Sequence, residues 1–390
     1  MKTLIELYDE RPIENVLATE VFEPETTVFL CPREIAQNKR IQKNILGFFR
    51  SRGVKTKVEF IEASLYSAEK VRRQLERIAE KYPDCVLDIT GGTDAALFAS
   101  GLMCAGSRIP VFTYSRKGGC FYNIQGADFA DRLKCEVNHS VRDCFMMAGG
   151  DMRQGRFENN RLKDNFDKID PFFEVYMKNR VSWQSAVNYI QSVSVSEKGA
   201  VPPLEIDAPY TVFGDRNRRV NAPEQVLRAL EEIGFIRELE IVRDRSVRFS
   251  FADENIRQWV RDVGSVLELY VYKACVDADI FNDVYTSAIV DWEGGRGRDN
   301  VTNEIDVIAM RRIIPLFISC KTCRIDTEAL NELEVLRERF GGYGAKAAIV
   351  TSSRSGAMAR HRASELDIHV IDLEDLRRGN ICEIIERIMR

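Results

Sequence analysis

The stretch EIDVIAMRRIIPLFISCKT, residues 304–322, contains two apolar runs that predict two β-strands, with Arg311, Arg312 and Pro315 in the turn between them. If the strands pair as a hairpin, Asp306 and Lys321 lie close together at its open end. Such a pair is typical either of a metal-dependent active site or of a solvated ion pair that contributes little stability.

A second carboxylate precedes this stretch, on a helix predicted over residues 252–275. Glu268 stands there among valine, leucine and tyrosine residues, at a position otherwise suited to burial. A charged side chain in such a place needs a partner or a metal ion. The following loop, residues 293–300, supplies Arg296 and Arg298, which are suited to holding the phosphates of a nucleic acid. These residues together favour an active site over an ordinary hairpin.

Outward from this region, strand-like and helix-like segments alternate from residue 1 to about 125, which predicts a mostly parallel sheet with helices on both faces. The run GCFYNIQ is predicted to pair antiparallel with IPVFTY across the turn SRKG. We predict an α/β protein with an N-terminal Rossmann-like domain over 1–150, a linker over 151–252 and a second α/β domain over 253–390.

The linker contains the predicted amphipathic helix QVLRALEEIGFI, followed by two strands around an Arg-Asp-Arg turn. A helix followed by a hairpin resembles a winged-helix fragment, which is one way to bind DNA. The helix carries a Glu-Glu pair and few cations, so a structural or dimerisation role is favoured.

A glycine loop, TGGT at residues 90–93, joins an apolar strand to a helix in the first domain. Open α/β sheets bind ligands beyond the carboxyl ends of their strands, and glycines let a phosphate approach the backbone amides. The absence of G-x-G-x-x-G disfavours a dinucleotide, and a tight β-α turn also needs glycine. The loop at 114–119 adds Arg116 and Lys117 at the same predicted rim. The two loops together predict an anionic ligand.

Composition excludes several classes. The 390 residues carry a formal net charge of −4, which gives no global sign of nucleic-acid binding. Ten scattered cysteines are typical of free thiols in a reducing compartment, and the single C-x-x-C at Cys320 and Cys323 lacks the further ligands of a zinc site. No apolar run is long enough for a membrane span and the N-terminus lacks a secretion signal, so we expect a cytoplasmic protein.

The elements G-x-x-L-E at 264–268, N-E-I-D at 303–306 and S-C-K-T at 319–322, together with the TGGT loop, resemble the type III CRISPR ancillary nucleases. In that family a CARF (CRISPR-associated Rossmann fold) domain is fused to a PD-(D/E)xK restriction-endonuclease-like domain. The resemblance implies a divalent metal, Mn²⁺ or Mg²⁺, held by Asp306, the backbone carbonyl of Cys320 and Glu268. It also implies that Lys321 orients or deprotonates the attacking water.

The sequence departs from this family at Ser319, where the family has glutamate or aspartate. A hydroxyl is a poorer metal ligand than a carboxylate, so the departure predicts weaker metal binding unless Glu268 or Glu304 takes that role. It also favours Mn²⁺, whose coordination tolerates a poorer ligand set.

The resemblance further implies a homodimer that binds a cyclic oligoadenylate, most often the tetra-adenylate, across its two CARF domains and then cleaves DNA, RNA or both in antiviral defence. By matching position, the residues that contact this activator are Thr90, Gly91, Gly92 and Thr93, with Arg116 and Lys117 at the rim and Pro32 and Arg33 after the strand TTVFLC.

Two alternatives remain open. In the first, the Ser319 change has inactivated the nuclease domain, and the protein is a cyclic-nucleotide-responsive regulator that binds DNA. Retention of Glu268, Asp306 and Lys321 together favours the enzyme. In the second, the first domain cleaves its own activator, but its loops contain no obvious acid-base pair. Activator ring size and the choice between DNA and RNA stay open.

Overall fold

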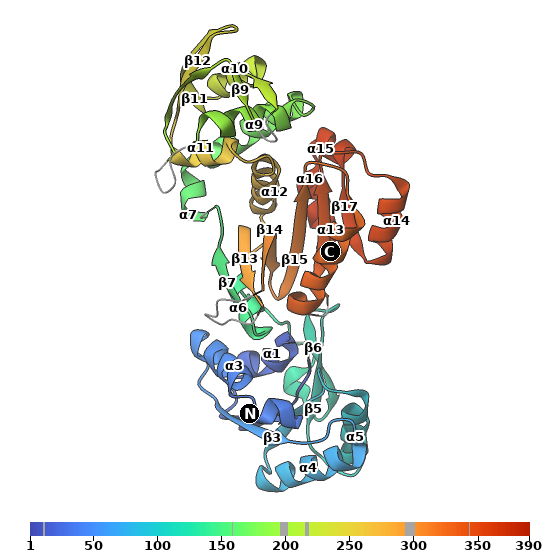
Figure 1. Ribbon diagram of the computed structural model, residues 1–390. Helices are drawn as coiled ribbons and strands as arrows, with labels where there is room; N and C mark the ends of the chain where they lie inside the picture. The colour runs from blue at the N-terminus through green and yellow to red at the C-terminus, as the bar shows by residue number, and fades with distance from the viewer. Residues whose placement is uncertain (11, 158, 196–201, 215–217, 293–300, 343) are drawn as a thin grey trace.

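The computed structural model describes residues 1–10, 12–157, 159–195, 202–214, 218–292, 301–342 and 344–390. The molecule is elongated and has three parts in a row (Figure 1). The N-terminal sheet lies at one end, the C-terminal sheet in the middle, and the helices and small sheets of residues 159–251 at the other end. None of the described helices is long and apolar enough to cross a membrane.

The N-terminal sheet has the order β3-β2-β1-β4-β5-β6, with parallel pairing from β3 to β5 and an antiparallel β6. The predicted Rossmann-like sheet and the predicted β5-β6 hairpin are therefore confirmed. Its strands are β1 (Thr3–Leu7), β2 (Thr26–Cys31), β3 (Lys57–Glu62), β4 (Cys85–Asp88), β5 (Val111–Ser115) and β6 (Cys120–Gln125). Its helices are α1 (Leu17–Phe22), α2 (Arg33–Ala36), α3 (Lys39–Ser51), α4 (Ala68–Lys81) and α5 (Asp94–Ala105), with the 3₁₀ turns η1 (Pro12–Asn15) and η2 (Asp128–Ala130).

Helices cover both faces of this sheet because its strands are apolar on both sides. Ile5 of β1 packs in one buried cluster with α4 and α5, whereas its neighbour Leu4 packs in another cluster with α1. Along α4, Val71, Leu75 and Ile78 recur at helical spacing and are the residues that the helix buries.

The C-terminal sheet has the order β17-β16-β15-β14-β13-β7 and is antiparallel from β7 to β15, then parallel. The predicted hairpin of residues 304–322 is confirmed as β14 and β15. The strands are β7 (Asp151–Gln154), β13 (Asp283–Asp291), β14 (Thr302–Arg311), β15 (Ile314–Lys321), β16 (Lys346–Thr351) and β17 (Ile368–Ile371). The helices are α6 (Val141–Met147), α11 (Glu254–Val260), α12 (Ser265–Asp277), α13 (Thr327–Leu336), the π-helical turn η5 (Arg337–Gly341), α14 (Ala357–Glu365), α15 (Leu373–Arg378) and α16 (Ile381–Ile388).

The single helix predicted over 252–275 is wrong, because the chain breaks into α11 and α12 between Val260 and Ser265. Asp262 makes the break: its Oδ1 accepts hydrogen bonds from the backbone N–H groups of Gly264 and Ser265, both at 2.9 Å, and from the Ser265 hydroxyl. Aspartate favours such local bonds over a continuous helix.

Residues 159–251, at the end of the molecule away from the N-terminal sheet, confirm the predicted helix and hairpin, as α10 (Glu224–Glu232), β11 (Ile236–Val242) and β12 (Ser246–Phe251). They also contain α7 (Asn159–Leu162), η3 (Lys163–Lys168), α8 (Ile169–Lys178), α9 (Trp183–Val193), β8 (Glu205–Pro209), β9 (Thr211–Phe213) and β10 (Arg219–Asn221). One buried cluster runs from Phe172 and Trp183 through α12 to Val307 of β14, so this part packs directly on the C-terminal sheet. The domain limits at residues 150 and 252 stay a prediction, although β7 joins a sheet whose other strands follow residue 282.

The β14-β15 hairpin connects the two sheet domains. Its turn inserts Ile313, which is buried in a cluster with Leu4 and Phe112 of the N-terminal sheet. The carbonyl of Arg312 accepts a hydrogen bond from the His139 N–H at 2.9 Å. One end of the hairpin is thus held in the N-terminal domain, while Asp306 and Lys321 lie toward the other end.

Candidate functional site

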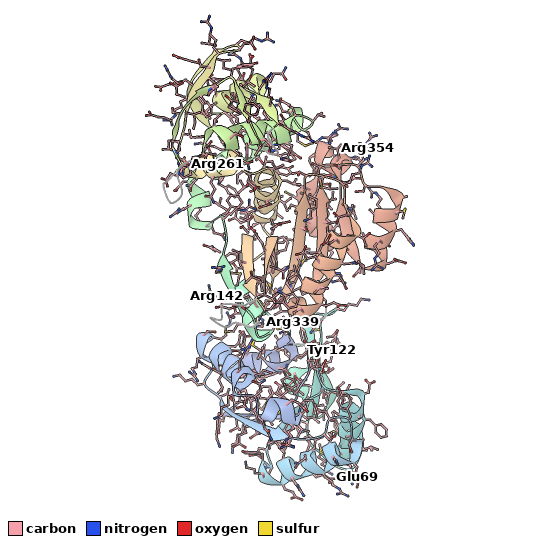
Figure 2. All side chains as sticks on the ribbon, in the orientation of Figure 1. Glu69, Tyr122, Arg142, Arg261, Arg339 and Arg354 are labelled. Carbon is pink, nitrogen blue, oxygen red and sulfur yellow. The ribbon has the colours of Figure 1, made fainter. Side chains whose placement is uncertain are left out.

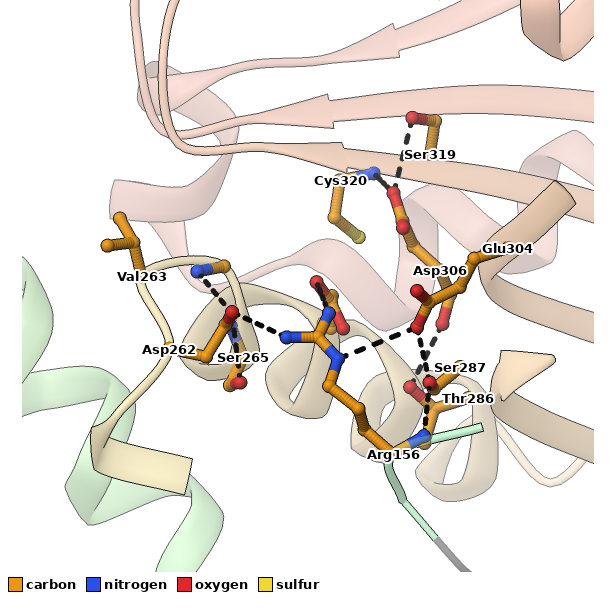
Figure 3. Close-up of polar contacts among 12 residues, drawn as sticks. Arg156, Asp262, Val263, Ser265, Thr286, Ser287, Glu304, Asp306, Ser319 and Cys320 are labelled. Atoms are coloured by element: carbon orange, nitrogen blue, oxygen red, sulfur yellow. Dashed lines mark hydrogen bonds and ion pairs between the residues drawn. The ribbon is translucent and has the colours of Figure 1, made fainter. Parts of the chain in front are cut away.

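Asp306 ends the pairing between β14 and β15. The last backbone pair on that side is Val307 with Ile318, and beyond it the Asp306 side chain bridges the two strands (Figure 3). Its Oδ2 accepts hydrogen bonds from the Cys320 N–H at 2.6 Å and from the Ser319 hydroxyl at 3.3 Å. Burial raises the pKa of Asp306, whereas the Cys320 N–H and the charge of Lys321 lower it. Ser319 therefore supports Asp306 rather than offering a second carboxylate.

Glu268 lies in the first turn of α12 with only 5% of its surface exposed. Among the described residues, none gives its Oε2 a hydrogen-bond partner. Burial is the largest cause that raises the pKa of Glu268 to about 8, and the neighbouring Asp306 carboxylate is the next. Glu268 was predicted to need a partner or a metal ion, and the described residues give a partner to only one of its two carboxylate oxygens. The carboxylates of Glu268 and Asp306 face the same space.

Arg156 was not predicted, and it lies among the acids of the site (Figure 3). Its guanidinium is 2.5 Å from Asp262 Oδ2, 3.5 Å from Glu268 Oε1 and 3.6 Å from Glu304 Oε1. The preceding Gly155 allows the close approach, because a Cβ there would meet the Ser287 carbonyl at 2.4 Å. Arg156 follows β7 and reaches α12 only through the pairing of β7 with β13, so no local sequence signal pointed to it.

Lys321 is the half-buried last residue of β15. Its carbonyl accepts the Ser352 N–H at 3.2 Å, on the β16 side, whereas the Cys320 N–H points to Asp306 on the β14 side. The N–H and C=O of one residue in a strand point to the same side, so the Cys320 carbonyl also faces Asp306. The structure thus brings together Glu268, Asp306, Cys320 and Lys321, whereas Arg296 and Arg298 lie outside the described residues.

The acids around Asp306 belong to the described residues and do not form a metal-binding cluster of side chains on their own. Among the described residues, no group of three or more histidine, cysteine, aspartate or glutamate side chains is placed to hold a metal ion. Cys320 is buried and Cys323 is exposed, so the C-x-x-C pair does not act as a unit. Trp292 donates its indole N–H to Asn303 at 2.7 Å and packs on Phe340, which is a core role.

In the N-terminal domain the TGGT loop follows β4, next to β1, where the strand order reverses. Open α/β sheets bind ligands at this switch point. Gly92 has a φ of +97° and donates its N–H to Asp9 Oδ2 at 3.0 Å, while Thr93 caps α5. Thr90 is occupied internally, because its hydroxyl bonds Asp88 and accepts the Tyr114 N–H.

A cavity of 1020 Å³ opens at this edge. Of the residues predicted to contact the activator, Pro32, Gly92 and Thr93 line it. The cavity also has walls that were not predicted: Tyr8, Asp9, Glu10, Glu34, Ile35, Leu65 and Tyr66, and Glu338 and Arg339 from η5 of the other domain. Figure 2 shows Arg339 at the junction of the two domains.

The other predicted contacts lie outside that lining. Arg116 forms a buried ion pair with Glu14, and Lys117 is exposed in the β5-β6 turn. Gly91 packs on Asp9, and Arg33 is exposed at the start of α2. The structure therefore gathers only part of the predicted set around one cavity.

Two buried acids, Glu6 and Asp88, lie beneath the TGGT loop, 2% and 1% exposed. Burial raises the pKa of Asp88 to about 7, and burial followed by the Asp88 charge raises the pKa of Glu6. The folded state thus binds more protons than the unfolded state from about pH 4 to 7, so the free energy of unfolding falls as pH rises through that window.

Replacing Glu6 with glutamine is expected to stabilise the protein at pH 8, and by much less at pH 5, because burial and the Asp88 charge raise the pKa of Glu6 and glutamine has no such ionisation penalty. Thermal melts of both proteins at the two pH values measure this. Glu62→Gln, an exposed position on β3, is the matched control and should shift neither melt. A variant less stable than its parent at pH 8 would contradict the prediction.

Residues 253–390 match the family model described as the Card1-like endonuclease domain. The whole chain is similar in fold to protein VC1899 from Vibrio cholerae, at 16% identity over 99% of this chain and 97% of that chain, with a TM-score of 0.77. It is also similar to Can2 from Sulfobacillus thermosulfidooxidans, whose structure holds cyclic tetra-adenylate, at 16% identity over 100% of both chains, with a TM-score of 0.70. No curated protein matches the sequence. The predicted resemblance to the type III CRISPR ancillary nucleases and the predicted fold class are confirmed.

Proposed function

We propose that this chain, whose C-terminal part carries a Card1-like endonuclease domain, is a metal-dependent nuclease that a cyclic oligoadenylate activates. Its substrates are DNA or RNA phosphodiesters, and its role is type III CRISPR antiviral defence. One observation carries the catalytic half of the proposal: the buried carboxylate of Glu268 and the half-buried carboxylate of Asp306 face a strand end that presents the Cys320 carbonyl and Lys321.

The residues fit a hard divalent cation. Carboxylate and carbonyl oxygens are the ligands that Mg²⁺ and Mn²⁺ prefer, and Glu268, Asp306 and Cys320 offer these. Glu268 Oε2 has no hydrogen-bond partner among the described residues, and the pKa values of both acids are raised. A bound cation would give that oxygen a ligand role and would favour the charged form of both carboxylates. When bound, the cation neutralises charge on the scissile phosphate and lowers the pKa of a water ligand.

The other residues position and neutralise. Lys321 places an ammonium group beside the carboxylates, where it orients the attacking water and stabilises the charge that develops on the phosphate oxygens. Arg156 pairs with Asp262, Glu268 and Glu304, so it offsets part of the negative charge that these acids place around the cation. Its contact with Asp262 also fixes the break before α12, and so the position of Glu268.

The ligand half rests on the cavity beside the TGGT loop and on the fold shared with Can2, which binds cyclic tetra-adenylate. Gly92 and Thr93 are suited to close approach of a phosphate, and the acids of the wall are suited to accept hydrogen bonds from adenine amino groups. In a homodimer, one two-fold ligand would report to both active sites. The β14-β15 hairpin gives a route, because its turn is buried in the N-terminal core.

The experiment is cleavage of supercoiled plasmid, labelled single-stranded DNA and labelled RNA by the full chain, with Mn²⁺ or Mg²⁺, and with or without cyclic tetra- and hexa-adenylate. We expect cleavage that needs both a cation and one cyclic ligand, and that is faster in Mn²⁺ because Ser319 replaces an acid. Faster cleavage in Mg²⁺ contradicts the metal preference. No cleavage of any substrate, with the cyclic ligand still bound, would favour the DNA-binding regulator.

A further inference from the structure

A second cavity, of 400 Å³, opens beyond the ends of β15 and β16, at the far end of the C-terminal domain from the N-terminal sheet. Four arginines dominate its wall, which consists of Arg180, Arg324, Ser353, Arg354, Leu373 and Arg377. Figure 2 shows Arg354 at this end of the domain. The site described above uses none of these residues.

The arginine pocket adjoins the catalytic strand end through Ser352. The Ser352 N–H donates to the Lys321 carbonyl at 3.2 Å, and the Ser352 carbonyl accepts from Arg180 Nη1 at 3.0 Å. Arg324 follows Lys321 by three residues on the same segment. The pocket and the proposed catalytic lysine therefore lie on consecutive parts of one edge of the sheet.

The charge of the pocket is only partly neutralised. Glu374 is shared by Arg354, at 2.9 Å, and Arg377, at 3.7 Å. Among the described residues, no ion pair is found for Arg324 or Arg180, and Arg180 is held by the Ser352 carbonyl instead. Four guanidinium groups against one carboxylate leave a strongly positive hollow.

We propose that this arginine pocket binds a backbone phosphate of the nucleic-acid strand that the site cleaves, and so fixes how the strand crosses Lys321. The inference rests on the proposed nuclease function and adds the place where the substrate is held. Guanidinium forks match phosphate oxygens in geometry and charge. Among the described residues of the lining, Leu373 is the one apolar side chain and none is aromatic, so no ring offers stacking for a base. The pocket therefore binds the phosphate backbone and does not discriminate between bases.

The test measures binding without cleavage. Full-length Asp306→Asn protein, with cyclic tetra-adenylate present in every arm, is titrated with labelled single-stranded DNA, duplex DNA and single-stranded RNA at several salt concentrations. Adding Arg324→Ala and Arg354→Ala should lower the slope of log affinity against log salt by about 0.7 per lost contact on single strands and about 0.9 on duplex, and weaken binding roughly tenfold or more.

The controls separate charge from fold. Arg390→Ala removes an arginine that is equally exposed and also paired with one glutamate, but that lies at the opposite end of the sheet, next to Met389, whose carbonyl binds Arg311. It should leave affinity and slope unchanged. Arg324→Lys with Arg354→Lys keeps both charges and should restore the parental slope. The nucleic acid on which the double alanine variant loses the most phosphate contacts, after each slope change is divided by its per-contact value, is the one that the pocket holds.

An unchanged slope in the double alanine variant, or a parent that binds no nucleic acid, overturns the pocket. The two proposals fail separately. If binding depends on the pocket but the wild-type chain cleaves nothing under any metal and ligand condition, the nuclease proposal is refuted and the pocket proposal is supported. Cleavage by the wild type, with a slope that the arginines do not affect, refutes the pocket alone.

Discussion

Replacing Asp306 with asparagine is expected to lower the cleavage rate roughly a thousandfold, because it removes a carboxylate ligand of the proposed cation from a water-poor site. Asparagine keeps the size of the side chain, and its amide oxygen can still accept the Cys320 N–H. The measurement is the single-turnover rate of the activated enzyme at saturating metal. A variant that cleaves at close to the parental rate would remove Asp306 from the reaction.

The same substitution should not unfold the protein. Burial raises the pKa of Asp306, so in the metal-free folded protein the charged form is disfavoured, and stability falls as pH rises through the raised pKa. Asparagine removes that cost, and a melt in chelator at pH 8 should show a variant at least as stable as its parent. A loss of cleavage in this variant can then be assigned to the missing carboxylate and not to unfolding.

Glu304→Gln is the matched control on the same strand. Glu304 is exposed and paired with Arg156, and the glutamine that replaces it has nearly the same side-chain volume. If Asp306 and Glu268 hold the cation, this variant keeps most of the activity. A loss as deep as that of Asp306→Asn would show instead that Glu304 supplies the acid that Ser319 lacks.

The catalytic residues were predictable because they violate the pattern around them. Asp306 and Glu268 interrupt apolar runs whose periodicity demands burial, and Lys321 ends one of those runs. Such a conflict between local pattern and residue type is visible in the sequence itself. The TGGT loop was visible for a similar reason, since a pair of glycines between a strand and a helix marks a backbone constraint.

The supporting residues were not predictable, because their roles come from long-range pairing. Arg156 reaches Glu268 only after β7 pairs with β13, more than a hundred residues later in the chain. In the sequence, Asp262 is one polar residue within a predicted helix. In the structure, its side chain accepts the Ser265 N–H and so caps the start of α12. Arg116 looked like a free cation at the rim, but it is buried against Glu14, whose position depends on the η1 turn. No periodicity encodes such contacts.

Replacing Gly92 with alanine is expected to weaken binding of the cyclic oligoadenylate by roughly ten- to a hundredfold. At a φ of +97° an alanine is strained, and its Cβ would lie 2.9 Å from Leu7 Cβ, a residue buried at the end of β1. A strained position of this kind costs about 1–3 kcal/mol, which the loop relieves by moving away from the cavity wall. Calorimetric titration with cyclic tetra- and hexa-adenylate measures the change.

Gly101→Ala is the control, because a Cβ at that helical position meets nothing within 4 Å and alanine favours the helix. It should bind the ligand as the parent does, and equal affinities for Gly92→Ala would remove the loop from the site. The cleavage assay then separates two roles of the loop. A ligand activates only through a difference in affinity between the inactive and active states. If Gly92→Ala reaches the parental rate at saturating ligand, the loop binds without discriminating those states. If the saturated rate also falls, the loop itself passes the signal to the hairpin whose turn is buried beneath the N-terminal sheet.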